Sequence, residues 1–320
     1  MKKFNCKICS KTAAFSNVLT RSKTKKKLLS CKNCDFEFFN FDPTKNLESN
    51  KLDITRLGRV GLKVPTLYEN FNRTIYQSNF YVKNYLNKKD KRKKILEIGC
   101  SHGSFLYLAK KFGCKVYGLE INNHLRNYLN KQMKIKCFKK LNEIEKIKMR
   151  FSKIFLFYSF EYFFDLKTEL NSIKNLLEPK GKIIIITPNK NDVLKSLSLN
   201  KGYKNFFYDI NSINYFSVKS LEKLMSKTNI SNYKIFLNQG YGIANLYNWA
   251  INQKPNKTGL VGEDDFLLQT INNFKIKKKS KKQNSTINKI KEILSQAERK
   301  YKRLLIKQGY GNQIILKITK

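Results

Sequence analysis

A short apolar run that stops at a glycine turn constrains this chain more than any other feature of its sequence. Residues 93–106 read KKILEIGCSHGSFL: the apolar run ends at Gly99, and an apolar helical pattern opens after Gly103. This order predicts a buried strand, a tight turn and a helix. Such a turn lets the backbone approach a bound nucleoside, and it points the first amides of the helix at the ligand.

An acidic residue follows at the expected distance from this turn. A second short strand is predicted over 115–119, and Glu120 stands at its end. A carboxylate at such a strand tip can accept hydrogen bonds from both hydroxyls of a ribose. The glycine turn and Glu120 together predict a site for an adenosine group.

Strands and helices alternate through the rest of the chain. All-apolar strands separated by helices indicate a parallel sheet that is covered on both faces, so we expect an α/β, Rossmann-like, doubly wound and mostly parallel seven-stranded sheet. The predicted strands cover 93–98, 115–119, 134–138, 153–158, 182–188, 231–237 and 312–318, with a turn at 178–181. The predicted helices cover 66–87, 103–112, 122–132, 166–177, 217–228 and 287–305.

Four cysteines near the N-terminus form two tight pairs. Cys6 and Cys9 make the first pair, and Cys31 and Cys34 follow after twenty-one residues. Two such turns bring four thiolates together, which suits a tetrahedral zinc ion, and they leave no open position for catalysis. We therefore expect a small zinc ribbon with a structural metal. The alternatives are a ribbon that has lost its metal and a redox-active thiol pair.

The chain carries an extreme positive charge, with 65 basic residues against 23 acidic ones. Nearly all of the basic residues are Lys, whereas nucleic-acid interfaces depend on Arg for bidentate contacts. Either an A/T-rich genome or an acidic partner, such as RNA, a nucleotide-sugar phosphate or an anionic membrane, accounts for this balance. No signal peptide opens the chain and its apolar runs are too short to span a bilayer, so we expect a cytoplasmic protein.

From about residue 66 to residue 320 the chain resembles a class I S-adenosylmethionine-dependent methyltransferase. The sequence around Glu97-Ile-Gly99 is similar to the first motif of that family, and FSKIFLFYSFEYFFD from Phe151 is similar to its fourth-strand motif. LLEPKGKIIIITPN and YFSVKSLEKLMSKTNI resemble its fifth strand and the helix that follows. The resemblance implies S-adenosylmethionine as cofactor. The residues expected to bind it are Glu97, Gly99, Ser101, Gly103 and Glu120, where Ser101 replaces the usual middle glycine of the loop.

A four-cysteine ribbon ahead of such a domain resembles one subgroup of the family, which methylates sugars and other small molecules in polysaccharide and antibiotic pathways. The resemblance implies methyl transfer to a small molecule, and we expect a sugar or a nucleotide-linked sugar used in surface polysaccharide biosynthesis. The expected domains are a zinc ribbon (1–45), a linker and lead-in helix (46–92), a cofactor-binding core (93–240), and a helical insertion with the last strand (241–320).

Candidate catalytic residues come just after the predicted fourth strand, because ligands bind at the strand ends of an open parallel sheet. They are Tyr158, Glu161 and Tyr162. A hydroxyl nucleophile is helped by a base and a carbon nucleophile needs one, and Glu161 could serve as that base. The alternatives are that Glu161 caps the next helix and that the tyrosines only form the wall of the pocket. An aromatic segment could form a lid or simply pack: Tyr203, Phe206, Phe207, Tyr208 and Tyr215.

Two other functions fit the same sequence. An RNA methyltransferase would use the ribbon and the Lys-rich surface to hold rRNA or tRNA. Against this alternative, the Asn/Asp-Pro-Pro-aromatic signature of amino-methylating enzymes is absent after the fourth strand. A third possibility is a non-enzymatic module that binds the cofactor without turnover.

Overall fold

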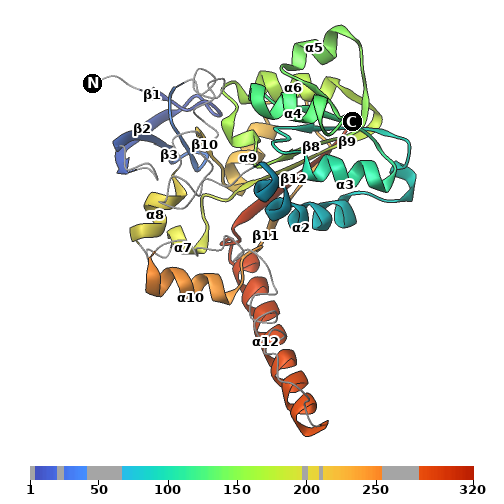
Figure 1. Cartoon of the computed structure of the whole chain (residues 1–320). Coiled ribbons are helices and arrows are strands. Elements are labelled where there is room, and N and C mark those ends of the chain that lie inside the picture. Colours follow the sequence, from blue (N-terminus) through green and yellow to red (C-terminus); the bar gives the residue numbers. More distant parts are fainter. Residues whose placement is uncertain (1–3, 20–24, 42–66, 197–200, 209–211, 254–280) are drawn as a thin grey trace. The chain divides into compact units, whose positions relative to one another are not determined.

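The structure of the chain, a computed structural model, describes residues 4–19, 25–41, 67–196, 201–208, 212–253 and 281–320 (Figure 1). Most of the predicted linker before residue 67 and the charged stretch 275–280 lie outside the described residues. The chain divides into two compact units. The first contains 1–188, 208–236 and 314–320, and the second contains 189–207 and 237–313. The predicted domain boundaries stay predictions.

A small antiparallel sheet carries the four N-terminal cysteines. Its strands are β1 (Phe4–Asn5), β2 (Thr12–Leu19), β3 (Lys25–Cys31), β4 (Phe36–Phe38) and β10 (Asn214–Tyr215), which neighbour one another in that order. The neighbouring strands of this sheet pair antiparallel, and the predicted ribbon is confirmed as an antiparallel sheet. Strand β10 was not expected, because it comes from a segment about 180 residues further along the chain.

The large sheet has seven strands in the order β11-β12-β9-β8-β5-β6-β7. The pairs β7–β6, β6–β5, β5–β8 and β8–β9 are parallel, which confirms the predicted doubly wound α/β fold. The strands are β5 (Lys94–Ile98), β6 (Lys115–Leu119), β7 (Lys136–Phe138), β8 (Phe151–Phe157), β9 (Leu177–Pro188), β11 (Tyr233–Asn238) and β12 (Gln313–Thr319). Their apolar residues form the core; Ile95 and Leu96 of β5, for example, are fully buried.

Helices cover both faces of this sheet: α2 and α3 lie on one side and α6 on the other (Figure 1). The helices of the first unit are α2 (Leu67–Tyr85), α3 (Ser104–Phe112), α4 (Asn123–Lys131), α5 (Leu141–Lys146), α6 (Leu166–Asn175) and α9 (Val218–Met225), with 3-10 helices η3 (Lys88–Asp90) and η4 (Phe160–Tyr162). None of the helices described is long and apolar enough to cross a membrane.

One predicted turn is wrong. Residues 178–181 lie inside β9, and so does Leu177, which was expected on the preceding helix. Phe151 pairs with Leu177, but Lys153 pairs with Lys182, so β9 accommodates three extra residues as a bulge. The proline and the glycine of this segment lie in the bulge and do not end the strand, because a bulge also needs unusual backbone conformations.

The helices that the structure describes in the second unit are α7 (Val193–Ser196), α8 (Lys201–Phe207), α10 (Ile243–Asn252) and α12 (Lys281–Lys307). Its core is aromatic: the Tyr203 ring lies 4.8 Å from the ring of Trp249, and both side chains are buried. The Tyr203 hydroxyl donates a hydrogen bond to Asp192 at 2.8 Å. Packing inside this unit therefore explains the burial of Tyr203.

Candidate cofactor site and four-cysteine cluster

The glycine turn lies at the end of β5 and begins α3. Gly99 and Gly103 both have left-handed backbones, with φ of +74° and +71°. A Cβ atom on Gly99 would lie 2.6 Å from Cβ of Ser159, and one on Gly103 would overlap Cδ2 of Leu129. Both positions therefore require glycine for conformation and for space. Ser101, within the turn, is exposed and also has a positive φ.

Glu120 lies directly beside this turn, as the sequence predicted. Its Oε2 accepts a hydrogen bond from the backbone amide of Ser101 at 2.9 Å. Its Oε1 accepts another from the amide of Asn122 at 2.9 Å, and the carboxylate is buried. The carboxylate therefore joins the ends of β5 and β6, which is the edge where open parallel sheets bind their ligands.

Glu97 is a second buried acid at this edge. Burial, together with repulsion from Glu120 and Cys137, raises the pKa of its carboxyl group well above the usual range. Its Oε2 has no hydrogen-bond partner within the parts of the chain that the structure describes. A buried carboxylate oxygen without a partner is costly, so this atom fits a cationic ligand group such as an ammonium.

The candidate catalytic residues follow β8. Tyr158 has a left-handed backbone, with φ of +52°, and its amide donates to Ile186 of the neighbouring strand at 2.8 Å. Glu161 and Tyr162 lie in η4. Glu161 is only 2% exposed, whereas Tyr158 and Tyr162 are half-buried. The structure brings the three together in one short segment at the end of β8.

Two residues that sequence reasoning missed contact this segment. Thr187, near the end of β9, donates from Oγ1 to Oε2 of Glu161 at 3.3 Å. Asn214, on β10, donates from its side-chain amide to the carbonyl oxygens of Glu161 and Phe163. The position of Thr187 at the end of a predicted strand could have revealed it, but no motif pointed to Asn214.

The four cysteines form one cluster. Their sulfur atoms all lie within 4.8 Å of one another, and all four side chains are buried. The Sγ atoms of Cys6 and Cys34 are 3.6 Å apart, and those of Cys9 and Cys31 are 3.5 Å apart. A tetrahedral zinc with Zn–S bonds of about 2.3 Å places its sulfurs about 3.8 Å apart, so the cluster fits zinc. The hydrogen bond between the thiols of Cys6 and Cys34 lowers the pKa of Cys6.

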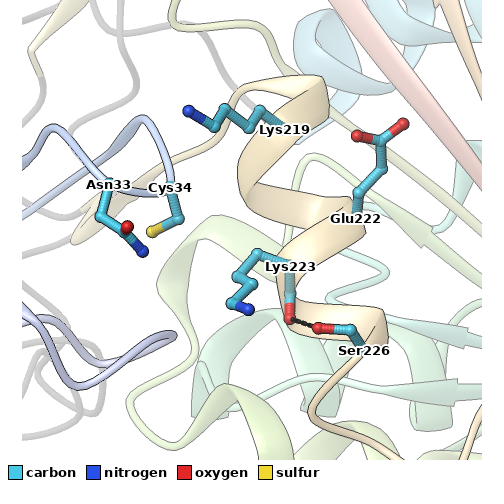
Figure 2. Close-up of a pocket in the computed structure, with 6 residues that line it drawn as sticks. All are labelled: Asn33, Cys34, Lys219, Glu222, Lys223 and Ser226. Atoms are coloured by element: carbon cyan, nitrogen blue, oxygen red, sulfur yellow. Dashed lines mark hydrogen bonds between the residues drawn. The ribbon is translucent and has the colours of Figure 1, made fainter.

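An open surface pocket lies between Asn33 and Cys34 of the ribbon and helix α9. Figure 2 shows Lys219 and Lys223 on the side of the helix toward Asn33 and Cys34, and Glu222 turned away. This pocket belongs to the surroundings of the cysteine cluster rather than to the site beside Glu120.

The remaining aromatic residues of the predicted lid pack in two places. Tyr208 and Tyr215 are buried against Phe39 of the ribbon, and the Tyr208 hydroxyl donates to Glu37 at 2.8 Å. Phe206 lies 5.0 Å from Trp249 in the second unit, measured between ring centroids. Packing accounts for both groups.

The model of the methyltransferase domain family matches residues 73–235, which are more than half of the chain. The chain belongs to this family. The match runs from α2 into β11 and includes the glycine turn, Glu120 and the segment after β8. The chain is therefore an S-adenosylmethionine-dependent methyltransferase whose N-terminal sheet carries a four-cysteine cluster. No curated protein sequence matches this methyltransferase.

Solved structures of other methyltransferases are similar to this one. A SAM-dependent methyltransferase from Archaeoglobus fulgidus shares 15% identity over 79% of this chain and 96% of its own, with a TM-score of 0.47. The plantazolicin methyltransferase BpumL, in complex with SAH, shares 17% identity over 87% and 94%, with a TM-score of 0.47. A possible histamine N-methyltransferase from Thermotoga maritima shares 14% over 78% and 91%, with a TM-score of 0.45.

Proposed function

We propose that this methyltransferase transfers the methyl group of S-adenosylmethionine to a small molecule, a sugar or a nucleotide-linked sugar of surface polysaccharide biosynthesis. The observation that carries the sugar assignment is the four-cysteine cluster directly ahead of the methyltransferase domain. This combination resembles the subgroup that methylates sugars. The proposal keeps the cytoplasmic location that the sequence predicted.

The cofactor site in this proposal is the edge formed by β5 and β6. The Glu120 carboxylate holds the ribose hydroxyls, and the turn from Gly99 to Gly103 gives the backbone close access to the nucleoside. Glu97 accepts the ammonium group of the methionine portion, because its buried Oε2 lacks a hydrogen-bond partner among the described residues. Ser101 is small enough to stand where the family has glycine.

The acceptor side of the proposed site is the segment after β8. A bound S-adenosylmethionine supplies a methyl group that its sulfonium already activates, so holding the nucleophile in line supplies much of the rate. Glu161 takes the proton of the acceptor, and Tyr158 and Tyr162 form the wall that orients it. The hydrogen bond from Thr187 supports this role, because it fixes one carboxylate oxygen and thereby orients the other.

The zinc in this proposal is structural. Four cysteine ligands occupy all of the positions of a tetrahedral ion, so no position is left for a substrate or for water. The burial of all four side chains supports the same role.

The test uses S-adenosylmethionine with a radiolabelled methyl group, the full zinc-loaded chain, and two separate acceptor pools. One pool contains nucleotide-sugars and the other contains total RNA. We expect label in the nucleotide-sugar pool, and its loss when Glu161 is replaced by Gln. Label in RNA alone, with binding that falls steeply as salt rises, would contradict the proposal and favour an RNA methyltransferase. Cofactor binding without label in either pool would contradict both substrate classes.

A further inference from the structure

Strand β10 lies between the ribbon and the segment that carries Glu161. On one side, Asn214 pairs with Phe38 of β4, and the amide of Phe39 donates to the carbonyl oxygen of Ile213 at 2.9 Å. On the other side, the amide of Ile213 donates to the carbonyl oxygen of Glu161 at 3.0 Å. A continuous set of backbone hydrogen bonds therefore connects the ribbon to η4.

The side chain of Asn214 makes this connection rigid. It is 1% exposed, and its Nδ2 donates to the carbonyl oxygen of Glu161 at 3.3 Å and to that of Phe163 at 2.6 Å. One buried amide thus bridges the two ends of the short turn in which Glu161 and Tyr162 stand. Without this side chain the Phe163 carbonyl would lose this donor and the Glu161 carbonyl would keep the amide of Ile213, so the side chain contributes to the conformation of the turn.

Buried rings connect the same two parts of the molecule. Phe216 lies 5.5 Å from Phe36 of the ribbon and stacks at 5.3 Å on Phe160, the first residue of η4, measured between ring centroids. All three side chains are fully buried. The Ser217 hydroxyl donates to the carbonyl oxygen of Asp35 at 2.8 Å. Asp35 and Phe36 directly follow Cys34, so the conformation of the second cysteine pair sets the position of these contacts.

The cofactor side of the site contacts the acceptor segment through Ser159, whose hydroxyl donates to the carbonyl oxygen of Ile98 at 2.8 Å, but its other contacts come from elsewhere. The amide of Gly99 donates to Leu119 of β6, and Ser101 donates to Glu120. Gly103 packs against Leu129 of α4. These contacts lie within the large sheet and its helices. The ribbon contacts described above instead reach the acceptor side.

We propose that Asn214 is a positioning residue, which couples the metal-bound ribbon to the segment of Glu161. A zinc ion bound by the four cysteines would thereby hold the acceptor side of the site in its working conformation, while most contacts of the cofactor side come from the large sheet. This inference rests on the proposed function for the role of Glu161, but the coupling itself is a structural property of the chain.

The test measures hydrogen–deuterium exchange by mass spectrometry in the full zinc-loaded chain, before and after the metal is removed with a chelator. Peptides that cover 158–165 report on the acceptor side, and peptides that cover 94–112 report on the cofactor side. We expect zinc removal to speed exchange in 158–165 by about tenfold and to leave 94–112 within about twofold. Unchanged exchange in 158–165 would overturn the coupling.

A substitution tests the part that Asn214 plays. Asn214→Asp keeps the size of the side chain but removes both donors, and Asn214→Ser is the milder variant if the first fails to fold. The control is Asn130→Asp, because the Asn130 amide also donates to two carbonyl groups, those of Arg126 and Cys137. We expect faster exchange in 158–165 only for the Asn214 variants. Equal exchange in the Asn214 and Asn130 variants would overturn the assignment.

Kinetics separate this role from a purely structural one. With an acceptor that the wild type methylates, Asn214→Ser is expected to lower kcat about tenfold and to leave the KM for S-adenosylmethionine within about twofold. An unchanged kcat would overturn the positioning role. The exchange experiment needs no acceptor, so failure to find a methylated substrate would count against the proposed function and not against the coupling.

Discussion

Replacing Gly99 by alanine tests whether the glycine turn is required for the reasons the structure indicates. The φ of +74° at this position costs a non-glycine residue about 1–2 kcal/mol. The new Cβ would lie 2.6 Å from Cβ of Ser159, and such overpacking costs a further ~1–3 kcal/mol. We therefore expect Gly99→Ala to lower the free energy of unfolding by about 2–5 kcal/mol.

Gly113→Ala is the matched control. Gly113 also has a positive φ, of +106°, but its Cβ would meet only the side chain of Lys91 at 3.5 Å, which is an ordinary contact. The expected loss there is about 1–2 kcal/mol, from backbone strain alone. Urea denaturation measures both variants, and calorimetric titration measures their affinity for S-adenosylmethionine. Only Gly99→Ala is expected to weaken cofactor binding.

A double-mutant cycle isolates the overlap. Ser159→Gly removes the Cβ that Gly99→Ala would meet, so the double variant is expected to lose less stability than the two single variants together, by about 1–3 kcal/mol. Additive losses, or equal losses in Gly99→Ala and Gly113→Ala, would refute the claim that close packing against Ser159 determines the turn.

Three further changes test other parts of the molecule. Burial raises the pKa of Asp192 from 3.8 to about 6. Between pH 3.8 and about pH 6 the folded chain therefore keeps a proton that the unfolded chain releases, so the free energy of unfolding falls as pH rises through this range. Relative to Asp192→Asn, the free energy of unfolding of the wild type is expected to fall by roughly 3 kcal/mol between pH 3 and pH 7. Urea denaturation measures both proteins, and parallel pH profiles for the two would contradict this. Thr187→Val removes the donor to Glu161 but keeps the shape of the side chain, and it is expected to lower stability by about 1 kcal/mol; unchanged stability in urea denaturation would count against the hydrogen bond. Cys34→Ser removes one zinc ligand, and a colorimetric chelator assay should find about one zinc per wild-type chain and far less in the variant; full zinc content in the variant would exclude Cys34 as a ligand.

The parts of the fold that sequence predicted are those with strong local signals. Strands β5 and β6 are short apolar runs bounded by glycine or an acidic residue, and their predicted positions lie within one residue of the observed ones. The cysteine cluster was predictable for a similar reason, because two Cys-x-x-Cys pairs each form a local turn. Four thiolates from two such turns can meet at one metal ion, and the structure brings the four sulfur atoms together.

The parts that could not be predicted depend on contacts between distant segments. Strand β10 has only two residues, too few for any periodicity, and it exists because it pairs with β4. Asn214 gains its importance from the two carbonyl groups it bridges, and nothing in the sequence around it marks that role. The bulge in β9 was mistaken for a turn, because the same proline and glycine serve both structures.

The candidate site likewise has a part that the sequence predicted and a part that it did not. The sequence predicted that Glu120 and the glycine turn meet, because both stand at the ends of neighbouring parallel strands. It did not predict how Glu161 is held. That carboxylate depends on Thr187 from β9, and its backbone depends on Asn214 from β10.

Calorimetric titration of S-adenosylmethionine into the full chain tests the central claim most directly. We expect one cofactor per chain, and an affinity at least about tenfold weaker in Glu120→Ala, because the variant loses the charged hydrogen bonds to the ribose. Glu145→Ala, at an exposed position of α5, serves as the control and should bind like the wild type. Wild-type affinity in Glu120→Ala would contradict the assignment of the cofactor site to the edge of β5 and β6.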